Sequence, residues 1–279
     1  MQSFNLSRLN IWHLSLFGLV CFSSLINDSI SFEYFKEQPA YLKPCKIYQP
    51  GFTACSTENT QSLIKELGKG IPEVNAVIGS IDPIKLKTIN FKQDNTEAAS
   101  LKADLTDLLA TGIKDLIIKE SKVSKKDFSW LTKIFMPKFK LEGHYKMDGR
   151  ILLLPLNGEG HFVIEIDNMD IIMRTKTNLI EKGGFTFYNI TSIKVDLEIS
   201  KLHTQFDDLF GGNNKEVERS TNESFNKNWK EFFEALRPLI NETVERVLFD
   251  ILYPVFLLIP ANFMIEDIPS PEKLYGKKQ

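Results

Sequence analysis

Cysteine and histidine are scarce in this chain, whose 279 residues contain 3 Cys and 4 His. No Cys/His cluster has the spacing of a metal site. The sequence also has no Gly-x-Ser-x-Gly elbow, no His-Glu-x-x-His, no Walker loop and no Gly-x-Gly-x-x-Gly after a strand. We therefore expect no enzymatic activity, no catalytic residue, no cofactor and no metal.

An excess of positive charge is also missing, since 34 Lys and Arg stand against 36 Asp and Glu, for a net charge of −2. Nucleic acids and anionic membranes call for a basic surface. We therefore expect no nucleic-acid partner and no stable membrane insertion. Phenylalanine, in contrast, is abundant, with 21 residues. Its apolar ring fills interiors and lines apolar cavities without needing a hydrogen bond.

A long unbroken apolar run is missing near the N-terminus. Residues 11–26, IWHLSLFGLVCFSSLI, are interrupted by His13 and several serines, and Arg8 precedes them. This pattern is typical of a signal-peptide core, and an uncleaved membrane anchor is the alternative. We predict a signal peptide over residues 1–29 and one secreted, extracellular domain over residues 30–279.

Loss of that signal segment would remove Cys21 and leave Cys45 and Cys55. In a secreted chain, an even pair this close predicts a disulfide. Closing a loop of this size is worth about 3 kcal/mol. If the chain is not secreted, two free thiols are the alternative.

Secretion also gives meaning to three glycosylation sequons, which begin at Asn189, Asn222 and Asn241. Asn222 lies in a polar stretch before a helix, so we expect it to be the best acceptor. Asn189 falls in a strand-like region and Asn241 in a helix, which makes both weaker candidates.

The predicted elements run from a short helix through a long antiparallel meander to a long helix. Alternating apolar and polar residues predict strands at residues 84–91, 99–106, 113–123, 138–147, 150–166, 169–180 and 185–202. Turn residues at 148–149, 167–168 and 183–184 separate several of these segments. Because strands and helices do not alternate, the fold class is α+β rather than a parallel α/β sheet.

The hairpin at residues 136–166, MPKFKLEGHYKMDGRILLLPLNGEGHFVIEI, is the most informative strand signal. Asp148 and Gly149 favour a two-residue type I′ turn, which would place Tyr145 opposite Leu152. One face of the second strand stays apolar for about fifteen residues, roughly 50 Å of strand. A strand of that length has to twist. We therefore predict a long, curled sheet with a concave apolar surface.

Residues 225–253 predict a helix about 43 Å long, with apolar residues on one arc and charged residues opposite. Pro238 lies on the polar side. A shorter helix is predicted earlier, with Thr57 as its N-cap and Gly68 near its end. The simple interpretation is an amphipathic helix packed on a sheet without a cavity. The alternatives are a helix that lines a cavity for an apolar ligand and a helix that lies on a membrane surface, the latter disfavoured by its slightly acidic polar face.

Five segments resemble, in order and spacing, the insect takeout and juvenile-hormone-binding protein family over residues 35–268. They are the lead with Cys45 and Cys55, IDPIKLKTINF, the hairpin above, FDDLFGGNN and NWKEFFEALRPLINETVERVL. The resemblance implies a single domain in which a highly curved antiparallel sheet wraps a long C-terminal helix. This is the TULIP-like super-roll of bactericidal/permeability-increasing and lipid-transfer proteins.

The resemblance also implies a secreted carrier that holds a fatty acid, a terpenoid or a juvenile-hormone-like molecule in an apolar tunnel. The chain is more similar to takeout than to the hormone carriers, because it lacks the cysteines for their second disulfide. Feeding, circadian and hormone-related roles are spread across the family.

The expected binding surface consists of the inner faces of the sheet and the helix. Its residues are Leu141, Tyr145, Leu152, Leu154, Phe162, Ile164, Phe187, Ile193, Val195, Trp229, Phe233, Leu236, Ile240 and Val244. We expect a monomer that binds a small hydrophobic ligand, with its receptor unidentified. The alternative is a secreted signalling or interaction protein whose interior is filled by its own side chains.

Overall fold

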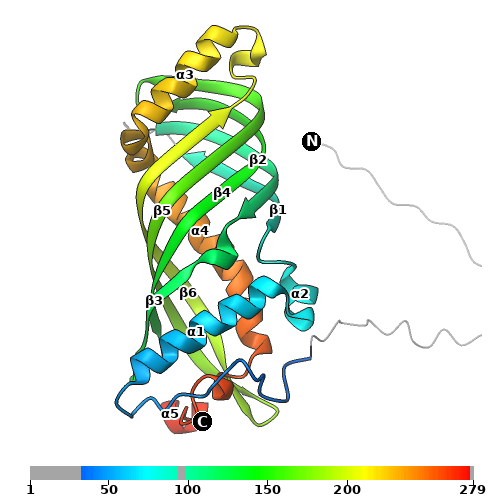
Figure 1. Cartoon of the computed structure of the whole chain (residues 1–279), viewed down its shortest axis with the longest axis vertical. Coiled ribbons are helices and arrows are strands. Elements are labelled where there is room, and N and C mark those ends of the chain that lie inside the picture. The colour runs from blue at the N-terminus through cyan, green and yellow to red at the C-terminus, as the bar shows by residue number, and fades with distance from the viewer. Residues whose placement is uncertain (1–32, 94–98, 277–279) are drawn as a thin grey trace, which may run out of the picture. The chain divides into compact units, whose positions relative to one another are not determined.

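One antiparallel sheet curls around a long helix in the computed structural model, which describes residues 33–93 and 99–276 (Figure 1). This arrangement confirms the predicted α+β class and the curved sheet with a C-terminal helix. The predicted signal peptide at residues 1–29 lies outside the described residues. The elements are α1 (Phe52–Lys69), α2 (Pro72–Ile78), β1 (Ile84–Gln93), β2 (Ala99–Thr111), β3 (Ile117–Val123), β4 (Trp130–Ile151), β5 (Leu154–Lys182), β6 (Phe185–Phe206), α3 (Lys215–Lys227), α4 (Trp229–Leu258) and α5 (Pro271–Tyr275).

The strand order is β1-β2-β4-β5-β6. β3 pairs with the same edge of β4 as β2 does, further along the strand. β4 pairs with β3 from Trp130 to Phe135 and with β2 from Lys140 to Ile151. The sheet therefore has a β3 half and a β2 half. In the β3 half, α1 packs against β3, whereas in the β2 half β1 forms the outer strand (Figure 1).

The predicted turn at Asp148 and Gly149 is wrong. Both residues stay in the ladder, Asp148 opposite Asn157 and Gly149 opposite Leu156, and the turn lies at residues 152–153. β2 lies so close to Gly149 that a Cβ atom there would collide with the carbonyl oxygen of Ser100. The glycine thus permits strand pairing on both sides of β4 instead of making a turn.

The predicted turn at residues 167–168 is also wrong, because β5 continues through it for 29 residues. Asn168 has φ 54°, a left-handed conformation that asparagine tolerates. Ile166 before it and Met169 after it are both buried. The inward side therefore changes from even-numbered to odd-numbered residues at Asn168. The predicted turn at residues 183–184 is confirmed, with Lys182 opposite Phe185.

The helices also differ from the predicted boundaries. α1 begins at Phe52 after Gly51, and the Thr57 hydroxyl donates to the Thr53 carbonyl inside the helix, so Thr57 is not its N-cap. The short helix α2 was not predicted. The predicted helix at residues 225–253 is two helices, because Asn228 leaves helical geometry between α3 and α4. α4 alone has 30 residues, or about 45 Å.

Polar side chains fasten α3 to the sheet edge at β6. Asn222 and Asn226 each accept a backbone N–H and donate to the C=O of the same β6 residue, Phe206 and Thr204 respectively. One helical turn rises about 5.4 Å and two strand residues about 6.6 Å, so helix positions four apart match strand positions two apart. This pairing places the helical layer along β6.

Two side chains of α4 continue the same seam. The Arg237 guanidinium donates to the Leu197 carbonyl, and the Glu245 carboxylate accepts from the Val195 N–H at 3.1 Å and from Lys194 Nζ at 2.6 Å. The β6 side of the sheet is thus closed by directed contacts along both helices.

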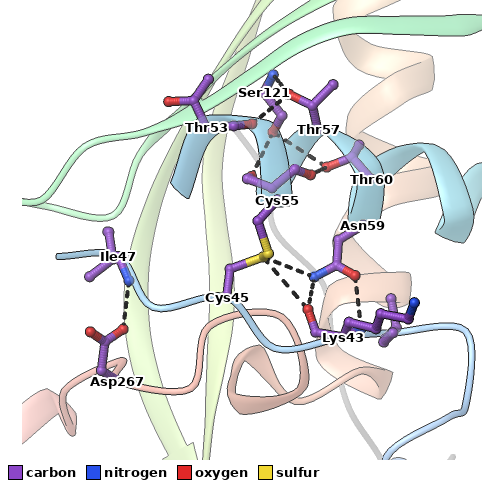
Figure 2. The surroundings of a disulfide bond; sticks show 12 residues. Lys43, Cys45, Ile47, Thr53, Cys55, Thr57, Asn59, Thr60, Ser121 and Asp267 are labelled. Carbon is purple, nitrogen blue, oxygen red and sulfur yellow. Dashed lines mark hydrogen bonds between the residues drawn. A yellow bond between two sulfur atoms is a disulfide. The ribbon is translucent and has the colours of Figure 1, made fainter. Parts of the chain in front are cut away.

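The predicted disulfide between Cys45 and Cys55 is confirmed, and it joins the segment before α1 to the first turn of α1 (Figure 2). Asn59 lies buried beside it. Its amide oxygen accepts from the Lys43 N–H at 2.8 Å, and its amide nitrogen donates to the Lys43 carbonyl. The Cys45 backbone also pairs with the C-terminal segment at Met264 and Glu266. Cys45 therefore connects to α1 through the disulfide and to the C-terminal segment through backbone hydrogen bonds.

Candidate ligand-binding site

An apolar cavity of about 170 Å³ lies in the β2 half, between the sheet and the first three turns of α4. β1, β2, β4, β5 and β6 form one wall, and the end of α3 and the start of α4 form the other. Among the described residues that line the cavity, Thr204 supplies the only hydroxyl group. Because the lining is otherwise apolar, the cavity favours a hydrocarbon group over water.

Six of the residues expected at the binding surface line this cavity together. They come from β5 and from the first turns of α4. These residues are Phe162, Ile164, Trp229, Phe233, Leu236 and Ile240. Their convergence follows from two periodicities: alternate residues of a strand share one face, and residues three or four apart share one stripe of a helix. As contacts to a ligand they stay predictions.

Four expected residues lie near the cavity without lining it. Leu152 is in the tight turn and Leu154 is the first residue of β5, because the turn lies four residues later than predicted. Leu141 is half-buried and packs within the core of the β2 half. Val244 lies further along α4, beyond the last lining residue, Ile240.

The three expected residues of β6 lie in the β3 half. Ile193 and Val195 are buried in packed core there. Phe187 points to the opposite side of the strand from Tyr188 and is covered by Tyr34, with ring centroids 5.2 Å apart. The pairing of β5 with β6 shifts by one residue at residues 190–192. The inward-facing residues of β6 therefore change from even-numbered to odd-numbered there, which the sequence pattern did not reveal.

Tyr145 does not offer its hydroxyl to the cavity. The hydroxyl donates to the Asp207 carbonyl at 2.6 Å, and the side chain is 2% exposed. Burial, more than the nearby carboxylates of Glu218, Asp208 and Asp207, raises the pKa of Tyr145. The folded protein thus holds a neutral phenol that supports the turn after β6.

Replacing Tyr145 with phenylalanine should lower the free energy of unfolding by about 1 kcal/mol at neutral pH, the value of one hydrogen bond. An unfolded phenol ionises near pH 10, and the folded one ionises higher. The wild type should therefore lose stability as the pH rises above about 10, and the variant should lose less. Urea unfolding near pH 7 and near pH 11 measures both effects. Tyr48→Phe, at an exposed tyrosine, is the control. Equal urea-unfolding curves for the wild type and Tyr145→Phe at both pH values would contradict a stabilising role of the buried Tyr145 hydroxyl.

Sequence reasoning missed all of the lining from β2 and part of the lining from the β4–β5 hairpin. Met147, Ile151 and Leu156 of the hairpin were left out of the expected surface. Leu101, Ala103 and Leu105 alternate along β2 and could have been found from that alternation. The other missed residues are Phe91, Leu202, Thr204, Phe206, Phe225, Phe232 and Leu239.

Stacked phenylalanine rings line the cavity at the α3 end. Phe225 of α3 and Phe232 of α4 lie face to face, with centroids 4.1 Å apart. Phe206 of β6 contacts Phe225 and stacks with Phe162, with 6.0 Å between the centroids in each pair. The break at Asn228 allows the first two rings to meet across the joint between the helices.

A second cavity of about 90 Å³ lies in the β3 half, between α1, β3, β4 and the end of α4. Its lining is largely apolar, but three hydroxyls gather on one side. Ser56 and Thr60 lie 3.2 and 3.3 Å from Ser121 Oγ. This cavity therefore differs from the larger one by offering a small polar group.

The expected best glycosylation acceptor, Asn222, is wrongly placed for that role. It is 5% exposed and both ends of its amide are hydrogen-bonded to Phe206, whereas a glycan needs a surface asparagine. Asn189 and Asn241 are half-buried, and the Asn241 amide oxygen is enclosed without a hydrogen-bond partner. Both stay predictions.

Within residues 33–93 and 99–276, no group of three or more His, Cys, Asp or Glu side chains is arranged to hold a metal ion. No helix in the same part of the chain has the length and apolar composition needed to span a membrane.

Comparison with known proteins gives consistent matches over most of the chain. The sequence model of the family "Haemolymph juvenile hormone binding protein (JHBP)" matches residues 16–266. The circadian clock-controlled protein daywake of Drosophila yakuba is 25% identical over 231 residues, covering 80% of this chain and 86% of that protein. The Drosophila melanogaster protein of that name is 25% identical over 235 residues, covering 82% and 88%. The crystal structure of Epiphyas postvittana Takeout 1 superposes with a TM-score of 0.70 at 20% identity, covering 81% of this chain and all of that one.

Proposed function

Because the chain belongs to the haemolymph juvenile hormone binding protein family, we propose that it is a secreted carrier of a small lipophilic molecule. The ligand would be a fatty acid, a terpenoid or a juvenile-hormone-like compound. It would be held between α4 and the curled sheet. Secretion is part of the proposal and rests on the predicted signal peptide.

The apolar cavity of about 170 Å³ carries this proposal. An apolar cavity of about 150 Å³ in another protein stays dry and binds benzene. Each methylene group moved from water into such a site contributes about 0.8 kcal/mol. The cavity as it stands therefore accommodates a short apolar group, and the rest of a longer ligand would have to extend beyond it.

The test is to secrete the full chain from eukaryotic cells, extract half of the purified protein with organic solvent, and examine the other half by native mass spectrometry. We expect a bound lipid in the extract and a matching mass difference in the intact protein. Delipidated protein should then bind a hydrophobic fluorescent dye with a single saturating site.

The competing function is a signalling or interaction protein with a filled interior. An empty extract, together with no saturable dye binding, would favour that function over a carrier. Retention of the protein inside the cell would contradict secretion but not ligand binding.

A further inference from the structure

A cleft of about 360 Å³ opens on the side of the β2 half, where β1 faces α2 and α4. β1 pairs only with β2 among the described strands, so its other edge is not covered by a strand. The apolar part of the lining, which we call the floor, is half-buried, and Thr88 and Asn90 of β1 add exposed polar side chains. The floor is formed by Val77 of α2, Leu86 and Ile89 of β1, and Val247 and Ile251 of α4.

The cleft follows the apolar cavity along the same two walls. On β1, Phe91 lines the cavity and Ile89 lines the cleft, about 7 Å apart along the strand. On α4, Ile240 lines the cavity and Arg246 lines the cleft, about 9 Å apart along the helix. An apolar chain that fills the cavity and continues between these walls would therefore emerge at the cleft.

The rim of the cleft is charged, with two cations and one anion. Lys87 of β1 and Arg246 and Asp250 of α4 are all exposed there. None of the three forms an ion pair with another described residue. An arginine guanidinium binds a carboxylate through two parallel hydrogen bonds, which lysine cannot do. The rim therefore offers net positive charge beside an apolar floor.

We propose that this cleft is the mouth of the binding site and holds the carboxylate of a long-chain amphiphilic ligand. Arg246 contacts the carboxylate, Lys87 adds positive charge, and the hydrocarbon chain runs along α4 into the cavity. This inference rests on the proposed carrier function and adds the ligand class, a fatty carboxylate, to it. Asp250 lowers the affinity for the carboxylate, which makes its effect opposite in sign to that of Arg246.

The experiment compares cis-parinaric acid, a fluorescent long-chain carboxylic acid, with its methyl ester as probes of the delipidated full chain. The wild type should bind the acid about tenfold more tightly than the ester, because only the acid is charged. Arg246→Gln should weaken acid binding roughly three- to tenfold and leave the ester unchanged. Asp250→Asn should tighten acid binding about twofold.

Two further variants protect the test against misfolding and general charge effects. Lys87→Gln, on the opposite wall, should weaken acid binding about twofold without affecting the ester. Arg219→Gln, on the exposed face of α3 beside Glu223, should leave both affinities unchanged. If acid and ester bind equally well to the wild type and to Arg246→Gln, the carboxylate site is overturned while the carrier function stands. If neither probe binds the wild type, both proposals are overturned.

Discussion

Replacing Ala103 with phenylalanine should weaken the binding of a hydrophobic dye or lipid by about a hundredfold, or about 2.7 kcal/mol. Ala103 is 5% exposed and lines the apolar cavity from β2, opposite α4. The added ring would occupy the space in which the ligand's apolar group is proposed to lie. Overpacking costs about 1–3 kcal/mol of stability, which a domain of this size tolerates.

The measurement is a fluorescence titration of delipidated protein, with circular dichroism to show that the variant is folded. Lys102→Met is the matched control, because Lys102 is the exposed neighbour on the other face of β2 and should leave the affinity unchanged. A folded Ala103→Phe protein with the affinity of the wild type would mean that the ligand binds elsewhere.

Removing the disulfide should have the largest effect on stability. Cys45 and Cys55 are 10 residues apart, and the entropy of closing that loop corresponds to about 3 kcal/mol. The double variant Cys45→Ala, Cys55→Ala should therefore unfold about 6–12 °C below the wild type. Differential scanning calorimetry measures this change.

The same comparison has an internal control. Wild-type protein in a reducing agent should show a similar loss, whereas the double variant should not respond to the reducing agent. A loss below about 1 kcal/mol would show that Asn59 and the pairing of Cys45 with the C-terminal segment hold α1 without the covalent bond.

The sequence predicted the architecture because its main signals are long. The apolar stripe of α4 and the alternation of β5 extend over many turns and residues, so a local irregularity does not hide them. The sequence-based prediction failed where pairing with a neighbouring strand was stronger than the turn preference of two adjacent residues. Asp148 and Gly149 are a good turn pair, but pairing with β2 and β5 holds them inside the ladder.

The cavity could be predicted only in part for a related reason. Helical spacing placed Trp229, Phe233, Leu236 and Ile240 on one stripe, and all four line it. Which strand residues meet that stripe depends on register, which sequence alternation alone does not settle. Whether the abundant phenylalanines fill the space or enclose it depends on how neighbouring rings stack.

Asn168 divides β5 into two stretches in which opposite sets of alternate residues face the interior, and a comparison with related sequences has to treat the two stretches separately. Before it, even-numbered positions such as Phe162 and Ile164 face inward; after it, odd-numbered positions such as Ile171 and Met173 do. An alignment that treats β5 as one uniform strand would assign half of its residues to the wrong surface. The position of this irregularity also matters in protein design. Moving it along β5 would exchange interior and exterior residues between its old and its new position.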